Sequence, residues 1–115
     1  MKADRIYIFV PRVLNTDAGP VRMPSGRAAA QCAHVSAKLA MMHANVYKMT
    51  TMVLEVANSQ ELEWVQKFLL KSGIGYMLQF DNLSDSKKQI LQAVATVPIT
   101  KAKSEKLKYF SLWTD

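Results

Sequence analysis

Segments typical of strands alternate along this chain with segments typical of helices. The strand-like segments are rich in β-branched and aromatic residues, and we expect strands at 6–10, 50–56, 75–80 and 93–99. Apolar residues at helical spacing, together with capping residues, predict helices at 25–47, 58–71 and 104–110. Strands separated by helices favour a layered α/β fold. We therefore predict a single three-layer α/β domain, with a mixed, mostly parallel four-stranded sheet and helices on both faces.

Residues at the ends of these segments set most of the expected boundaries. Ser25 is a candidate N-cap for the first helix, and residues 58–61, "NSQE", match a capping box. Gly73 is a natural stop for the second helix. Residues 13–25 contain many loop formers and predict a long loop. Residues 83–91 fit a loop or a short helix equally well.

The composition bounds the class of protein and its partners. Half of the 115 residues are hydrophobic, which is enough to bury the core of one domain spanning 1–115. The formal charge of +6 favours an anionic partner such as nucleic acid. A single cysteine allows no internal disulfide, so we expect a cytoplasmic protein. The apolar run at 6–10 is too short to cross a bilayer, and we expect no membrane partner.

The first predicted helix carries an apolar face and a polar stripe. The apolar face, which should enter the core, consists of Ala28, Cys32, Val35, Leu39 and Met42. The polar stripe consists of Arg27, Gln31, His34 and Lys38, which are four, three and four residues apart. A solvated helix surface explains this spacing. A binding site for an anion explains it too, because Arg27 lies beside the unpaired amides of the first turn, where Gly26 lets a ligand approach the backbone.

Residue spacing argues against several other kinds of site. Cys32 and His34 are two residues apart on the helix, which places them about 200° apart around its axis, so they do not form a nucleophile and base pair. His34 and His43 fall on opposite sides of the same helix, and the lone cysteine does not complete a metal-ligand set. The segment "SGRAAAQ" has one glycine where phosphate- and dinucleotide-binding motifs need several. We therefore expect no metal and no cofactor.

Asp81 directly follows the third predicted strand. Open α/β sheets bind their ligands at the carboxyl ends of strands, which makes Asp81 a candidate site residue. A structural role is equally compatible with this position, because aspartate begins turns and caps helices.

The segment "SGRAAAQCAHVSAKLA", residues 25–40, resembles the signature of the peptidyl-tRNA hydrolase 2 family. That family carries Gly-Lys-hydrophobe-Ala-Ala-Gln-Cys-Ala-His-Ala at the start of its first helix, and the match from Gly26 to His34 is nearly continuous. The order of the predicted elements and the aspartate after the third strand also resemble the family. The likeness thins after Asp81.

The resemblance implies a function and a set of site residues. Members of the family hydrolyse the ester between a peptide and the 3′ ribose of tRNA, use no metal, and are commonly dimeric, so tRNA and a second copy are the implied partners. The catalytic candidates are Asp81, Arg27 and His34. The candidates for substrate binding are Gly26, Gln31, Ser84, Ser86, Lys87 and Lys88. The lysines of the C-terminal third are expected to contact the tRNA backbone.

Three positions depart from the family pattern. Arg27 replaces the motif lysine, and because arginine does not release its proton, a mechanism that uses a neutral lysine as base is closed to this chain. Asp85 and Ala93 fall where the family has threonines, and Ser84 or Ser86 is the candidate substitute for a lost hydroxyl. Three hypotheses follow: an esterase acting on peptidyl-tRNA, a non-catalytic relative that binds tRNA or another partner, and a small α/β interaction protein whose alanines serve only close packing.

Overall fold

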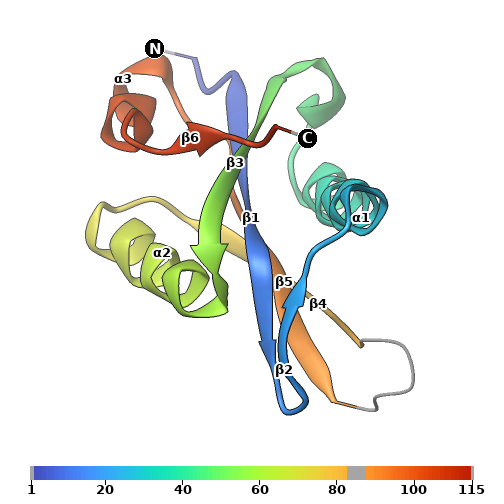
Figure 1. Cartoon of the computed structure of the whole chain (residues 1–115). Helices are drawn as coiled ribbons and strands as arrows, with labels where there is room; N and C mark the ends of the chain where they lie inside the picture. Colours follow the sequence, from blue (N-terminus) through green and yellow to red (C-terminus); the bar gives the residue numbers. More distant parts are fainter. Residues whose placement is uncertain (1, 83–87, 115) are drawn as a thin grey trace.

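The computed structural model describes residues 2–82 and 88–114 (Figure 1). The strands are β1 (Arg5–Thr16), β2 (Gly19–Arg22), β3 (Thr50–Asn58), β4 (Tyr76–Asn82), β5 (Gln89–Thr96) and β6 (Ser111–Leu112). The helices are α1 (Ser25–Met42), α2 (Ser59–Lys71) and α3 (Lys101–Ser104), with 3-10 turns η1 (Val46–Lys48) and η2 (Glu105–Leu107). In this part of the chain, the strands form one six-stranded mixed sheet in the order β4-β5-β1-β3-β6, with β2 paired to β1.

The direction of the strands corrects the predicted sheet. Among the described pairings only β1 with β3 is parallel, whereas β1–β2, β1–β5, β3–β6 and β4–β5 are antiparallel. The expected four-stranded, mostly parallel sheet is therefore replaced by a larger and largely antiparallel one. The length of one connection explains why β4 and β5 are antiparallel. The segment from Asn82 to Gln89 is far shorter than the dozen or more residues that a parallel crossover needs.

A β-hairpin occupies most of the segment that was predicted to be a loop. β1 continues past Pro11 to Thr16, and β2 returns antiparallel to it. The turn between them is closed by Thr16, whose hydroxyl donates to the Gly19 carbonyl oxygen at 2.6 Å, and by the positive φ of 106° at Gly19. Pro11 interrupts no antiparallel ladder, since the pairing of β1 with β5 lies at Ile8 and Phe9 and that with β2 starts only at Val13.

α1 starts at the predicted residue but ends earlier than expected. Pro24, not Ser25, occupies the N-cap position, and Pro24 O accepts the first helical hydrogen bond from Ala28 N at 3.0 Å. The helix ends at Met42 instead of residue 47, because Asn45 adopts a left-handed conformation that starts η1. Ala28, Val35 and Leu39 are buried as predicted, and Cys32 is half-buried. Met42, in contrast, is largely exposed.

α2 confirms both of its predicted end signals. Asn58 Oδ1 accepts a hydrogen bond from Glu61 N at 2.9 Å, while the Glu61 carboxylate accepts one from Ala57 N at 3.1 Å. At the other end Gly73 has a φ of 68°, and Ile74 N donates to Leu69 O at 2.9 Å, which is the geometry of a Schellman cap. Leu69 and the other inward residues of this helix pack on the sheet.

The helices α1 and α2 lie on opposite faces of the sheet (Figure 1), and an apolar layer holds each of them there. The layer under α1 contains Ile6, Ile8, Val10, Val35, Leu39 and Ala93. The layer under α2 contains Phe9, Leu54, Leu62, Val65, Leu69 and Val94. Odd and even residues of β1 thus enter different layers, as do Ala93 and Val94 of β5, which is expected for strands buried on both faces.

The segment that contains Leu107 and Phe110 lies on the α2 side of the sheet, whereas Trp113 packs on the α1 side. The helix predicted at 104–110 is divided into α3 and η2, which are followed by β6. Leu107 and Phe110 pack in the layer under α2. The strand predicted at 93–99 is β5, shifted to residues 89–96. Within residues 2–82 and 88–114, none of the helices is long and apolar enough to cross a membrane.

Candidate functional site

Asp81 and Gln31 meet between the sheet and α1. Asp81 lies near the carboxyl end of β4, and Gln31 lies on the first half of α1. Gln31 Nε2 donates a hydrogen bond of 2.8 Å to Asp81 Oδ2. The polar stripe predicted for α1 is wrong at this position, because Gln31 is only 2% exposed and lies on the buried face between Ala28 and Val35. The bond to Asp81 is what allows an amide to occupy that face.

The surroundings of Asp81 favour its ionised form. The hydrogen bond from Gln31 lowers the pKa of the Asp81 carboxyl most, followed by a 2.8 Å hydrogen bond from Asn82 N to Asp81 Oδ1. Burial raises this pKa by less than either hydrogen bond lowers it, and the charges of Arg27 and His34 lower it a little further. Asp81 is therefore a carboxylate at neutral pH, with each oxygen fixed by one donor.

The other candidate residues on α1 differ in how exposed they are. Arg27 is partly buried in the first turn, whereas His34 and Lys38 are exposed. Arg27 and His34 are near enough for their charges to act on the Asp81 carboxyl, which brings the three catalytic candidates into one region. Gly26 is exposed, and an added Cβ there would meet nothing within 4 Å. The backbone at Gly26 therefore gives no structural reason for glycine.

Two buried glutamines join this region and were not predicted. Gln79 lies two residues before Asp81 and therefore on the same face of β4. Gln79 Nε2 donates to Phe80 O at 3.1 Å, and Gln92 Nε2 makes a long contact of 3.5 Å with Asp81 O. Both side chains are at most 5% exposed. The amides of three glutamines, Gln31 included, thus surround the end of β4.

A β-bulge brings Gln92 to this position. Gln79 pairs with Ala93 and Phe80 pairs with Leu91, so Gln92 has no residue opposite it. The alternation of Gln79 and Asp81 along β4 was readable from the sequence, since they are two residues apart. The bulge carries no such signal, because no glycine or proline marks it.

The three glutamines leave an unusual set of acceptors. The side-chain oxygens of Gln31, Gln79 and Gln92 are buried and accept no hydrogen bond from the described part of the protein. Buried carbonyl oxygens are normally paired, and an unpaired one costs about 1–3 kcal/mol. These oxygens are buried, so they raise the cost of packing α1 against β4 and β5 and are not exposed to a ligand.

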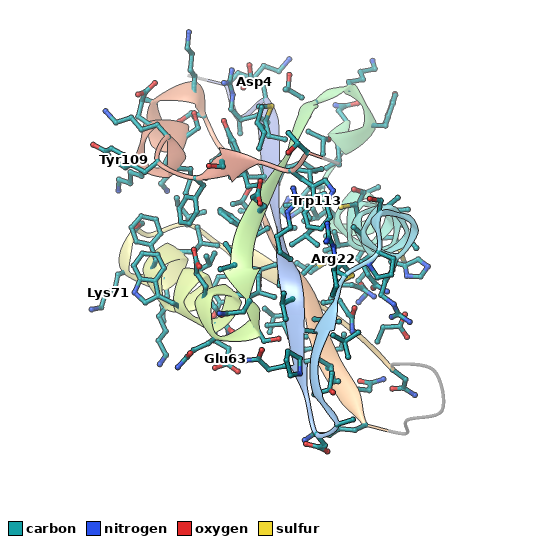
Figure 2. The ribbon with its side chains drawn as sticks, viewed as in Figure 1. Asp4, Arg22, Glu63, Lys71, Tyr109 and Trp113 are labelled. Carbon is teal, nitrogen blue, oxygen red and sulfur yellow. The ribbon has the colours of Figure 1, made fainter. Side chains whose placement is uncertain are left out.

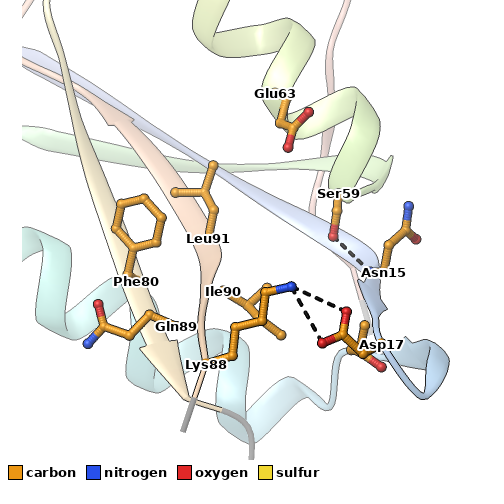
Figure 3. Close-up of a pocket in the computed structure, with 10 residues that line it drawn as sticks. Asn15, Asp17, Ser59, Glu63, Phe80, Lys88, Gln89, Ile90 and Leu91 are labelled. Atoms are coloured by element: carbon orange, nitrogen blue, oxygen red, sulfur yellow. Dashed lines mark hydrogen bonds and ion pairs between the residues drawn. The ribbon is translucent and has the colours of Figure 1, made fainter. Parts of the chain in front are cut away.

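The remaining predicted residues lie elsewhere or outside the described residues. Ser84, Ser86 and Lys87, and also Asp85, lie outside 2–82 and 88–114. Lys88 Nζ is 3.2 Å from Asp17 Oδ1, at the tip of the β1–β2 hairpin (Figure 3). The hollow drawn there is lined by Ser59 and Glu63 of α2, so it belongs to the α2 side of the sheet.

The C-terminal lysines also lie on the α2 side. Lys103 Nζ donates to Gly73 O at 2.8 Å, and Lys106 Nζ donates to Ser72 O at 3.2 Å. Both lysines thus reach the C-terminal end of α2. Because Asp81 faces α1, these lysines lie on the opposite side of the sheet. They therefore add no positive charge to the region around Asp81.

Thiol chemistry at the site would depend on Cys32, and metal chemistry would depend on clustered side chains that bind metals. Burial raises the pKa of the Cys32 thiol, which disfavours the reactive thiolate. Among residues 2–82 and 88–114, no three His, Cys, Asp or Glu side chains lie together as a metal site requires.

Comparison with known proteins adds no further identification. No protein-family model matches the chain, and a search of curated proteins gives no match.

Proposed function

We propose that this protein hydrolyses the ester between a peptide, or an N-blocked amino acid, and the 3′ end of tRNA. The observation that carries the proposal is the 2.8 Å hydrogen bond from Gln31 to Asp81. It joins the "GRAAAQCAH" segment of α1, which resembles the peptidyl-tRNA hydrolase 2 signature, to the aspartate at the end of β4. The charges of Arg27 and His34 act on the same carboxylate.

Asp81 orients the attacking water in this proposal. Its lowered pKa keeps it ionised, so it accepts a hydrogen bond from water, but the same property makes it a weak base. The water oxygen attacks the ester carbonyl carbon, the bond from this carbon to the 3′ ribose oxygen breaks, and the water proton ends on that ribose oxygen. Orientation and charge stabilisation then supply most of the rate enhancement.

Arg27 stabilises negative charge in this scheme. A guanidinium beside the first turn of α1 binds either the terminal phosphate of the tRNA or the oxyanion that forms on the ester carbonyl. Arg27 remains protonated, so it takes no part as a base. His34 is exposed beside it and positions the RNA end.

The decisive experiment measures release of a labelled N-blocked amino acid from tRNA. Asp81→Asn should lower the rate by about 10²-fold, the usual effect of misplacing a reacting group, because the carboxylate that orients the water is lost. Asp4→Asn is the matched control, because Asp4 is an exposed aspartate just before β1 whose carboxylate pairs with Arg5, and its rate should not change. Wild-type release that Asp81→Asn leaves intact would exclude Asp81 from catalysis.

Arg27 has a separate test. Arg27→Ala should weaken tRNA binding and reduce its dependence on salt, because one phosphate contact is lost. Equal binding of the variant and the wild type at several salt concentrations would contradict a phosphate contact.

A non-catalytic tRNA-binding relative is the second candidate function. Ala93, which falls near a threonine of the family pattern, is fully buried in β5 and offers no hydroxyl. Salt-sensitive tRNA binding that Arg27→Ala weakens, without any release of the labelled amino acid, would favour this candidate. The expected homodimer and cytoplasmic location stay predictions, and light scattering of the purified protein tests the first.

A further inference from the structure

The outer surface of α2 carries an exposed tryptophan beside two lysines. Trp64, Lys67, Phe68, Leu70 and Lys71 line one shallow hollow, which we call the α2 hollow. Trp64 is 54% exposed and Leu70 is 69% exposed, although both are large apolar residues. Lys67 and Lys71 are three and seven residues after Trp64, and therefore lie on its side of the helix. The hollow combines an aromatic surface with positive charge.

The indole of Trp64 is held in place from one side. Its ring stacks on Phe68 with centroids 5.3 Å apart and planes 12° apart, and Phe110 of the C-terminal segment lies at 6.4 Å. Because one face is covered and more than half of the side chain is exposed, the other face remains accessible. A fixed indole loses little conformational entropy when a second planar group stacks on it.

Positive charge surrounds the hollow at the end of α2. Lys71 projects outward from α2 (Figure 2). Lys103 and Lys106, which donate to Gly73 O and Ser72 O, bring two more amino groups to this end. The lining of the α2 hollow itself contains no acidic residue.

The hollow continues along α2 toward β4. A neighbouring hollow shares Lys67 and Leu70 with it and adds Tyr76 and Phe80. Glu63 lies at this junction and also borders the hollow of Figure 3. Aromatic rings thus recur along a path that begins at a cluster of lysines.

We propose that the α2 hollow binds single-stranded RNA, with a base stacked on Trp64 and the neighbouring phosphates on Lys67 and Lys71. Proteins bind single strands in this way, by aromatic stacking combined with positive charge along the backbone. The site lies on the face of the sheet opposite Asp81, and the proposal does not depend on hydrolysis there.

Charge and shape favour RNA over two other occupants. A second copy bound about a two-fold axis would bring the lysines of this surface against themselves, which is unfavourable. A helix that lies on a membrane inserts its main apolar face, whereas α2 buries that face, Leu62, Val65 and Leu69, against the sheet.

The test uses a fluorescein-labelled 12-nucleotide oligouridylate and the full chain, with binding measured by fluorescence anisotropy. This RNA carries no ester, so its binding is measured without the proposed hydrolysis. Trp64→Leu should weaken binding by about 5- to 150-fold, which is the effect of losing one stacked base. Tyr47→Leu, at a similarly exposed aromatic residue, is the matched control and should have no effect.

A lysine variant keeps the test valid if Trp64→Leu fails to fold. Lys67→Gln with Lys71→Gln alters only exposed residues and should reduce the slope of log affinity against log salt by about 1.4, at about 0.7 for each lost phosphate contact. Lys2→Gln with Lys48→Gln should leave the slope nearly unchanged. Equal binding by the Lys67/Lys71 variant and the wild type would overturn the proposal. So would Trp64-dependent dimerisation, or binding to phosphatidylserine vesicles, in a protein that does not bind the RNA.

Discussion

Replacing Gln31 with methionine tests whether the amide on α1 controls the charge of Asp81. Methionine has a similar size and keeps the side chain in the core, but it removes the 2.8 Å hydrogen bond to the carboxylate. A hydrogen bond to a charged group contributes about 1.5–3 kcal/mol, and the partial exposure of Asp81 reduces the expected loss to about 1 kcal/mol at pH 7. The pKa of Asp81 should rise toward its ordinary value.

The loss of stability should depend on pH in a defined direction. The folded-state pKa of Asp81 is below its ordinary value of 3.8, so the carboxylate stabilises the fold above that pH and loses this effect as the pH falls through the folded-state pKa. The difference between wild type and Gln31→Met should therefore be largest at neutral pH and shrink in acid. Urea unfolding at pH 7, 5, 4 and 3 measures the difference, and ¹³C NMR titration of Asp81 measures the pKa directly.

Gln66→Met is the matched control for this experiment. Gln66 Nε2 donates to the hydroxyl of Tyr76 at 3.2 Å, which is a neutral bond on the α2 side. Its loss should cost about 0.5–1.5 kcal/mol at every pH tested, because the bond joins an amide to a hydroxyl and involves no carboxylate. An equal loss at all pH values for Gln31→Met, with no rise in the pKa of Asp81, would refute the role assigned to the amide.

Three further changes test the fold. Asn58→Ala should lower the free energy of unfolding by about 1 kcal/mol in urea, since the cap of α2 is lost, and a neutral result would contradict the capping box. Gly73→Ala should cost about 1 kcal/mol or more because its φ is 68°, whereas a stabilised variant would mean that the helix ends differently. Arg12→Leu should release the C-terminal residues, because Arg12 contacts Glu55 at 2.7 Å and its guanidinium lies 3.8 Å from the ring centroid of Trp113. Faster carboxypeptidase digestion and altered Trp113 fluorescence would report the release, and unchanged rates would contradict it.

The sequence predicted those elements whose end signals are local. The capping box at the start of α2 and the glycine at its end involve residues within a few positions of each other, and both appear in the structure. The alternation of strand-like and helix-like segments also predicted the α/β class. The direction of the strands was not predictable in this way, because it depends on which strands pair across the sheet, and the predicted parallel arrangement was wrong.

The site was predictable only where position along the chain determines it. Asp81 was found from its place after a strand, and its contact with the motif on α1 brings in Gln31. Helical spacing assigned Gln31 to a polar stripe opposite the apolar face, because spacing does not distinguish a polar residue at the surface from one that faces a carboxylate inside the fold. Gln92 was missed for a related reason, since a β-bulge arises from the pairing of two strands and not from one of them.

The central place of β1 in the sheet has a consequence for folding during synthesis. β1 pairs with β2, β3 and β5, and Tyr7 N donates to Thr96 Oγ1, 89 residues further along the chain. At about 5–20 residues per second, a ribosome needs roughly 4–18 seconds to make that partner after Tyr7. Throughout this interval the apolar residues of β1 lack one of their neighbours. The nascent chain therefore exposes apolar surface of the kind that chaperones bind until residue 96 has been made.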